Sequence, residues 1–181
     1  MALTIADLTE IANQFLRDEY GMALEIPIKR NNRLRRAMGR YIESYNEQDE
    51  LVPDRIEISG EMFEYGADIA IIKTLKHELV HYALSLKGEP NDDGHPYFEA
   101  ELRRVGADST KSTALGRAAL YRCTDCGVVD LTATPRYIKR IAESTRGWRT
   151  NCCNAPLAYI DTIICDGTKS VAEIIKEANG V

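Results

Sequence analysis

The sequence predicts an α+β protein in two parts, a larger domain of helices and short strands followed by a smaller, cysteine-containing domain. Three observations lead to this prediction. Apolar residues recur at helical spacing in two long stretches, 4–20 and a second that begins at about Glu61 or Ala67 and ends near Leu86. Strand-like pieces lie between these stretches. All five cysteines follow residue 120, whereas all three histidines lie between residues 77 and 95, which indicates two separate sites.

The elements of the first part follow from local patterns. In the stretch 4–20 the apolar residues share one helix face, and Gly21 stands where a helix-ending glycine would. Pro53-Asp54 predicts a turn before the third strand-like piece. The three pieces cover residues 23–29, 38–44 and 55–59.

The second long helix should end at Gly88, and residues 89–94, rich in Pro, Asn and Asp, should form a loop before a further helix at about 96–106. Polar residues 108–113 predict a domain edge. Near the end of the chain, Ser170 and Glu173 form the pattern of a capping box that opens a short helix.

Composition excludes several classes of protein. The chain has 181 residues, 28% of them charged, and a formal net charge of −5, values that exclude a collagen-like fibre or a disordered tail. Charged residues interrupt every apolar stretch before it reaches the length of a membrane span, and the N-terminus lacks the pattern of a secretory signal. We therefore expect a soluble, cytoplasmic protein with no membrane partner.

The most specific pattern is His77-Glu78-Leu79-Val80-His81 within the second long helix. Histidines four residues apart lie on one helix face, so both imidazoles can reach one metal ion. Glu78 would accept a proton from a zinc-bound water and pass it to the leaving amine. A catalytic zinc has three protein ligands and one open position, so a third ligand is required. His95 is the remaining histidine and is the expected third ligand; the alternative is an ordinary loop histidine.

A second metal site is predicted at the cysteines. Cys123-Thr124-Asp125-Cys126-Gly127 places two thiolates two residues apart before a glycine that permits a tight turn, as in zinc knuckles. A redox pair is the alternative, but it would need a βαβ pattern, which is absent. The chain supplies the adjacent pair Cys152-Cys153 for the second half of the site. Position 150, where a regular ribbon would have a cysteine, is a threonine, so the fourth ligand is Cys152, Cys165 or none; we favour Cys152.

Basic residues are concentrated in two regions. Residues 29–40 carry six bases and no acid, and residues 117–149 carry seven bases against three acids. Such clusters either bind nucleic acid or only keep the protein soluble. In the second region, Trp148 beside arginines could stack on bases of single-stranded DNA or fill a small core. The candidate nucleic-acid-binding residues are Arg33, Arg35, Arg36, Arg40, Arg146 and Trp148.

Several of these motifs together resemble the SprT-like metalloprotease family, which includes the Spartan DNA–protein crosslink proteases. The resemblance rests on Thr74–His81, on Asp93-Gly94-His95, and on Tyr121-x-Cys123-x-x-Cys126-Gly127 followed by Cys153 and Leu157. It covers roughly residues 5–157. It implies a zincin-like protease domain with His77, His81 and His95 as zinc ligands and Glu78 as general base. It also implies a zinc ribbon after this domain, in which Cys153, aligned on Leu157, is a ligand. This chain has His95-Pro96 where the family usually has His-Gly.

We therefore expect a zincin-like domain at 1–112, a zinc ribbon at 113–165 and a terminal helix or tail at 166–181. The expected cofactors are one catalytic and one structural Zn²⁺, and the expected function is hydrolysis of DNA-associated or DNA-crosslinked proteins. Two other functions remain open. One is a non-catalytic nucleic-acid-binding protein with a structural or vestigial histidine site, and the other is a metal hydrolase that acts on something other than a peptide.

Overall fold

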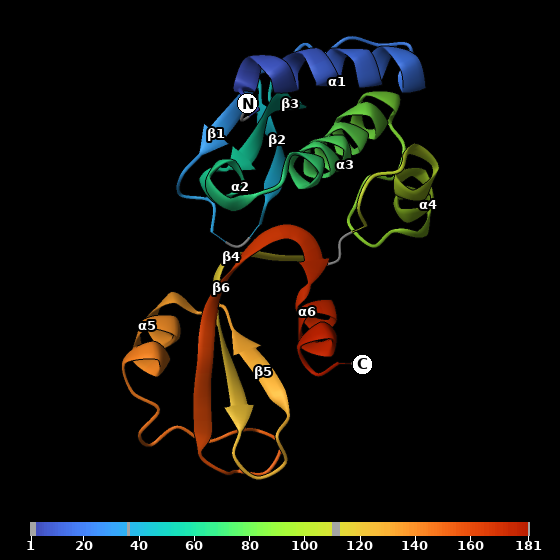
Figure 1. Cartoon of the computed structure of the whole chain (residues 1–181). Helices are drawn as coiled ribbons and strands as arrows, with labels where there is room; N and C mark the ends of the chain where they lie inside the picture. The colour runs from blue at the N-terminus through green and yellow to red at the C-terminus, as the bar shows by residue number, and fades with distance from the viewer. Residues whose placement is uncertain (1–2, 36, 110–112, 181) are drawn as a thin grey trace. The chain divides into compact units, whose positions relative to one another are not determined.

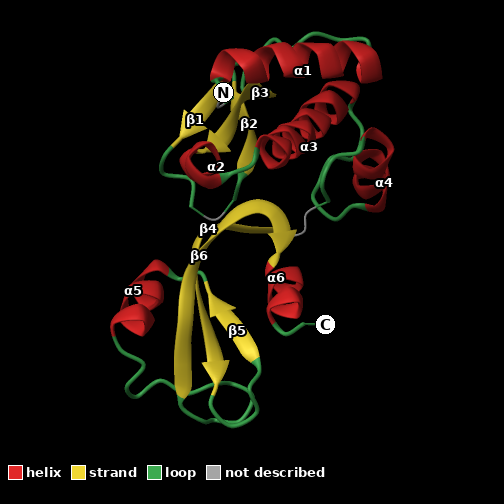
Figure 2. Ribbon diagram, viewed as in Figure 1, coloured by secondary structure: helices red, strands yellow, loops and turns green. Residues whose placement is uncertain are grey.

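The computed structural model describes residues 3–35, 37–109 and 113–180. The chain divides into two compact units, residues 1–111 and 112–181. Both units mix helices and strands (Figures 1 and 2), so the α+β prediction is confirmed. No helix among the described residues is long and apolar enough to cross a membrane.

The first unit is a three-stranded sheet covered by helices. Its elements are α1 (Ile5–Tyr20), β1 (Ile28–Asn31), β2 (Gly39–Tyr45), β3 (Leu51–Ser59), α2 (Gly60–Tyr65), α3 (Asp68–Lys87) and α4 (Pro96–Val105). The strand order is β1-β3-β2; β3 is parallel to β1 and antiparallel to β2. In Figure 1, α1 and α3 lie side by side against this sheet. The core between them contains fully buried side chains from every layer: Leu8, Leu16, Ile56, Ile58, Leu75 and Leu79.

Local signals fix the ends of the main helices. Thr4 and Asp7 form a capping box at the start of α1, and Gly21 ends it in the left-handed conformation with φ 67°. Gly88 ends α3 in the same way, with φ 66°. The predicted second long helix is two helices, because Gly66 adopts an extended conformation with ψ 138° and interrupts the helix between α2 and α3.

Two strands begin at other residues than the sequence predicted, β1 at Ile28 and not at residue 23, and β3 at Leu51 and not at residue 55. Pro53 lies within β3 and not in a turn, at a place where β3 pairs with β2 but not yet with β1, so its missing N–H leaves no ladder partner unsatisfied. The chain turns instead at residues 46–50, where Asn46 Oδ1 accepts the N–H groups of Gln48 and Glu50. The first strand begins only at Ile28.

The extended residues before β1 bond to helices and not to the sheet. The backbone N–H of Leu24 donates to the Asn13 side chain of α1, and that of Glu25 donates to the Tyr82 hydroxyl of α3. This segment is therefore hydrogen-bonded to α1 and α3. Its apolar residues alternate along the chain as they do in a strand, so the sequence alone did not distinguish it from one.

The second unit is an antiparallel sheet of order β5-β4-β6 with one helix following β5 and one ending the chain. Its elements are β4 (Thr113–Cys123), β5 (Val129–Thr132), α5 (Pro135–Glu143), β6 (Leu157–Ser170) and α6 (Val171–Ala178). The predicted capping box of Ser170 and Glu173 opens α6. A small core is formed by Ala114, Ala118, Leu131 and Cys165, against which Ile174 and Ile175 of α6 pack.

Residues 166–181, predicted as a separate terminal segment, contain the end of β6 and all of α6, which contact the same sheet. The Asn179 side chain donates to the Val129 carbonyl and accepts from the Val129 N–H, both at 2.8 Å. This pair of bonds attaches the end of α6 to β5.

Candidate metal centres

Helix α3 places His77 and His81 one turn apart, and both rings are largely buried, with 13% and 14% of their side chains exposed. Each ring is oriented by a backbone carbonyl. His77 Nδ1 lies 2.8 Å from the Asp108 carbonyl oxygen, and His81 Nδ1 lies 2.6 Å from the Asn91 carbonyl oxygen. Because a carbonyl only accepts, both Nδ1 atoms carry a proton, and each imidazole in its neutral form presents the Nε2 lone pair.

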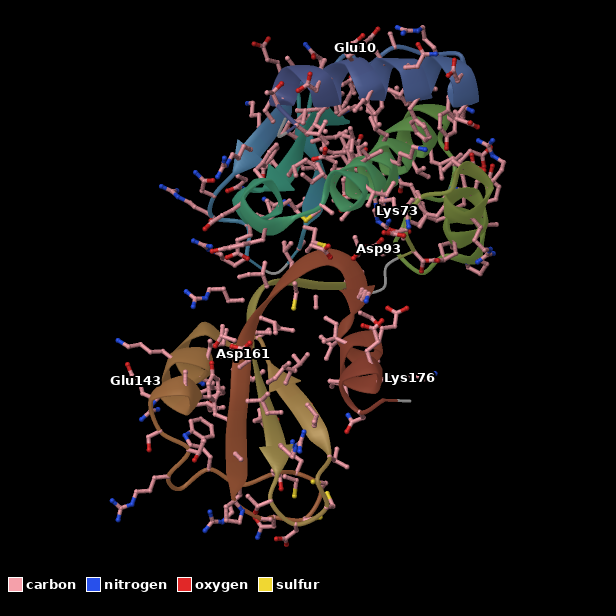
Figure 3. All side chains as sticks on the ribbon, viewed as in Figure 1. Glu10, Lys73, Asp93, Glu143, Asp161 and Lys176 are labelled. Carbon is pink, nitrogen blue, oxygen red and sulfur yellow. The ribbon has the colours of Figure 1, made fainter. Side chains whose placement is uncertain are left out.

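The two lone pairs face each other and a carboxylate. His77 Nε2 is 3.2 Å from His81 Nε2, and Asp93 Oδ1 is 3.1 Å from the former and 3.5 Å from the latter. Figure 3 labels Asp93 in the loop between α3 and α4. Three possible ligand atoms at these distances fit a cation. Tetrahedral zinc with ligand bonds of about 2.0–2.1 Å separates its ligand atoms by about 3.3 Å, which matches this spacing.

Phe98 of α4 supports the two imidazoles. Its fully buried ring stacks on His81 with centroids 4.2 Å apart and meets the His77 ring edge-on at 5.3 Å. The His77 carbonyl partner is held as well, because the Asp108 side chain forms an ion pair with Lys73 of α3 at 3.0 Å. Residues on both sides of α4 thus fix the orientation of the rings, as outer-shell groups do in metal sites.

His95, the expected third ligand, occupies a different place in the structure. It is exposed at the start of α4, where its Nδ1 accepts the Tyr97 backbone N–H at 3.2 Å as an N-cap. The group whose ligand atoms all lie within 4.8 Å of one another is His77, His81 and Asp93. His95 as a ligand stays a prediction. Asp93 was not predicted as a metal ligand, although the available signal was a carboxylate two residues before His95.

Glu78 is buried on the side of α3 that faces β2, with 7% of its surface exposed. Its Oε2 accepts the Tyr41 backbone N–H at 2.8 Å. Burial raises the pKa of Glu78 to about 7, against the opposing effects of His77 and of the Tyr41 hydrogen bond. Burial also lowers the pKa of His81, which favours the neutral imidazole needed for a ligand. Glu78 is therefore a carboxyl group suited to accepting and releasing a proton near neutral pH.

The four predicted cysteines come together in the second unit. The sulfur atoms of Cys123, Cys126, Cys152 and Cys153 lie within 4.8 Å of one another, and Cys126 Sγ is 3.5 Å from Cys152 Sγ. Tetrahedral zinc with Zn–S bonds of about 2.3 Å requires sulfurs about 3.8 Å apart, so the cluster fits zinc. Cys165 of β6 instead lies in the small core with Ala114, Ala118 and Leu131.

Thr150 occupies the position where a regular ribbon would have a cysteine. Its buried hydroxyl donates to Cys123 Sγ at 3.3 Å. This hydrogen bond, together with backbone N–H groups, lowers the pKa of Cys123 to about 6 and favours the thiolate that binds metal. The role of Thr150 was not predicted, because the sequence shows only that a cysteine is missing there.

The first basic cluster is partly neutralised. Arg35 forms an ion pair with Glu61 at 2.5 Å, and Arg40 forms one with Glu57 at 3.0 Å. Burial acts to raise the pKa of Glu57, but hydrogen bonds from Arg55, Asn31 and Arg40 lower it to about 2. Two of the predicted nucleic-acid residues thus have acidic partners. Arg33 is exposed, and Arg36 lies outside the described residues.

The second basic region contains an aromatic pocket. The Trp148 and Tyr137 rings meet edge-to-face with centroids 5.2 Å apart, and the Arg136 guanidinium lies 4.7 Å from the Tyr137 centroid. The half-buried Trp148 and the exposed Arg146 line one pocket together with Arg140, Glu143, Ser144 and Gly147. The predicted pair Arg146 and Trp148 is therefore brought to one place.

Comparison with known proteins identifies a family for the region that contains the histidine site. The sequence profile of the SprT-like family matches residues 5–117, which include the histidine site. A "Protein SprT-like" of Staphylococcus epidermidis is 33% identical over 129 residues, 68% of this chain and 78% of the relative. Proteins of the same name from two Staphylococcus aureus strains are 26% identical over 154 residues (83% and 92% of the chains) and 29% identical over 131 residues (70% and 77%).

Measuring zinc affinity at the histidine site would distinguish Asp93 from His95 as the third ligand. Because Asp93 Oδ1 faces both Nε2 atoms, Asp93→Ala should weaken zinc binding at this site by about 10- to 100-fold or more, measured by competition with a chromogenic chelator. His95→Ala, a matched variant two residues away, should change it much less. The reverse order of effects would show that His95 is the third ligand and that Asp93 only contacts the rings.

Zinc binding at the cysteines has an internal control. Cys152→Ser should loosen or abolish the second zinc, because Cys152 Sγ belongs to the four-sulfur cluster. Cys165→Ser changes a thiol of the small core of the second unit and should leave two zinc ions per chain in elemental analysis. Equal zinc content in wild type and Cys152→Ser would remove Cys152 from the ligand set.

Proposed function

Since the chain belongs to the SprT-like family, we propose that it is a zinc-dependent metalloprotease that hydrolyses peptide bonds with Glu78 as general base. The observation that carries the proposal is the arrangement on α3. Two imidazole lone pairs and the Asp93 carboxylate converge on one point, while the next residue after His77 is a buried carboxyl group whose pKa is raised to about 7.

In this mechanism the chain holds the metal through His77 and His81, with Asp93 or His95 as the third ligand. Bound zinc would supply an acidified water and polarise the scissile carbonyl. Glu78 accepts the proton of the attacking water and then delivers it to the leaving amine. The carbonyls of Asn91 and Asp108 keep both imidazoles in the tautomer that binds metal throughout the cycle.

The number of metal-binding side chains favours a catalytic role for the histidine site over a structural one. Among the described residues the cluster comprises three groups, whereas a structural zinc site is usually closed by four protein ligands. The cysteine cluster supplies four sulfurs and so has the character of a closed, structural site. We therefore assign catalysis to the first unit and metal-dependent folding to the second.

We further propose that the substrates are proteins bound or crosslinked to DNA, and that the second unit holds single-stranded DNA. The support is the pocket of Trp148, Arg140 and Arg146, which combines an aromatic ring with two cations. Aromatic stacking with phosphate contacts is the usual way to hold single-stranded nucleic acid without sequence preference. The same observation supports a second candidate function, a non-catalytic nucleic-acid-binding protein, which the activity of Glu78 variants would separate from the first.

Replacing the general base tests the hydrolytic mechanism. Glu78→Gln should lower the rate of hydrolysis of an unfolded protein, free or bound to single-stranded DNA, by about two to four orders of magnitude, because the amide cannot accept the proton. Zinc content should stay at the wild-type value, since Glu78 is not part of the cluster of His77, His81 and Asp93. Glu89→Gln, the same charge change at an exposed residue after α3, is the matched control.

Undiminished hydrolysis by Glu78→Gln would reject the mechanism. Absence of hydrolysis by the wild type on both substrates would favour the non-catalytic nucleic-acid-binding protein. If the wild type instead hydrolyses non-peptide amides or esters in a manner that requires Glu78, the protein is a metal hydrolase of another substrate class.

DNA binding by the second unit is tested on an oligo-dT strand with a fluorescence anisotropy titration. Trp148→Ala should weaken affinity by about 5- to 150-fold, because one stacked base contributes about 1–3 kcal/mol. Arg146→Ala should reduce the slope of log K against log salt by about 0.7. Arg103→Ala, an exposed arginine of α4 in the first unit, is the control. Unchanged affinity and slope in the Trp148 and Arg146 variants would exclude this pocket as the DNA site.

A further inference from the structure

Strand β2 approaches the general base with its backbone. It is an edge strand, since the sheet order is β1-β3-β2, and it also contacts α3. Gly39 is paired with Ile58 and Tyr41 with Ile56 of β3. The N–H of Tyr41 is not used in this ladder but points to α3, where it donates to Glu78 Oε2 at 2.8 Å.

Gly39, two residues earlier on the same strand, faces the same carboxyl group. A Cβ atom at this position would lie 2.8 Å from Glu78 Oε1, 2.9 Å from Glu78 Cγ and 2.7 Å from Thr74 Cγ2. Contacts of this length do not occur for real Cβ atoms, so any side chain at Gly39 would displace one of these groups. Gly39 does not have a positive φ, so its lack of a side chain, not its conformational freedom, is what the structure uses.

From these two contacts we infer that Gly39 and Tyr41 are positioning residues that fix the two oxygens of the Glu78 carboxylate separately. The Tyr41 N–H holds Oε2, while the absence of a side chain at Gly39 leaves the space that Oε1 occupies. The inference rests on the proposed role of Glu78 as general base. It assigns to β2 the task of fixing the orientation of this carboxylate on α3.

The Tyr41 side chain strengthens this attachment of β2 to α3. Its hydroxyl lies 3.2 Å from Ser85 Oγ and 3.1 Å from Glu43 Oε1, and its ring is parallel to the His81 ring at a centroid distance of 6.4 Å. Glu78 and Ser85 are seven residues apart, which is two turns of helix and places them on the same face. Tyr41 therefore binds α3 at two points along that face, by its backbone and by its side chain.

A backbone donor suits this role for a physical reason. The Tyr41 N–H belongs to a strand that is hydrogen-bonded to β3 on its other side, so it cannot rotate away as a side chain can. A carboxylate held by such a donor keeps its orientation while its second oxygen gains and loses a proton. Preorganisation of this kind is what allows a buried base to act without reorganising during the reaction.

The first test is kinetic. Gly39→Ala should lower kcat by about 100-fold, as displacements of about 1 Å near reacting groups do, with KM and zinc content unchanged. Thr74→Ser removes the Cγ2 atom that an alanine at position 39 would also meet, and it serves as the reference background. The loss of kcat should persist in Gly39→Ala/Thr74→Ser, because the contact with Glu78 remains. Recovery of kcat in this double variant would overturn the inference, since packing against Thr74 would then be the cause.

The second test does not require activity. In the Thr74→Ser chain with zinc bound, Gly39→Ala should lower the urea midpoint of unfolding, and the same substitution should lower it much less in Thr74→Ser/Glu78→Ala, where Cγ and the carboxylate are gone. Equal shifts with and without Glu78 would overturn the inference. A wild type without hydrolytic activity would reject the proposed function, yet this thermodynamic cycle would still decide whether Gly39 acts on Glu78.

Discussion

The close approach of the Nε2 atoms of His77 and His81 is the constraint around which the histidine site of the first unit is arranged. His77 and His81 present bare Nε2 atoms 3.2 Å apart because the carbonyls of Asp108 and Asn91 occupy their Nδ1 protons. Two acceptors and a carboxylate at this distance repel one another unless a cation lies among them. The loops before and after α4 supply Asn91, Asp93 and Asp108, and they bring these three residues to the two imidazoles of α3.

Helix geometry places the two histidines and the proposed general base Glu78 on different sides of α3. Consecutive residues are separated by about 100° around a helix, so Glu78 cannot share the face of His77. The imidazoles are directed to Phe98 and the loops around α4, whereas the carboxyl group is directed to β2 and is buried there. Glu78 is thus supported mainly by β2, whose Tyr41 ring also lies parallel to the His81 ring, whereas the imidazoles are supported mainly by Phe98 and the loops around α4.

Local signals in the sequence predicted the ends of α1, α3 and α6 and the motifs that the structure brings together in two clusters, but they did not predict α5 or the break at Gly66, and they were insufficient where contacts between distant residues decide. Gly21, Gly88 and the Ser170 capping box mark helix ends through bonds within one turn, so they could be read directly. The start of β3 before Pro53 depends on which neighbouring strand pairs with it, and the contact of Asp93 with α3 depends on how a loop closes. Neither has a local signature, because each is determined by tertiary packing.

The cysteine cluster contains two adjacent residues of the chain. Side chains of adjacent residues normally diverge, yet Cys152 and Cys153 both reach the cluster. They lie in a tight turn in which the Asn154 N–H donates to the Thr150 carbonyl, the Thr150 N–H donates to the Ala155 carbonyl, and Asn154 adopts φ 53°. Asparagine tolerates this left-handed conformation better than most residues. Thr150, at the position a ribbon cysteine would occupy, keeps a bond to Cys123 Sγ through its hydroxyl. Cys152 thus lies in the sulfur cluster, while Thr150 is a hydrogen-bond donor to Cys123.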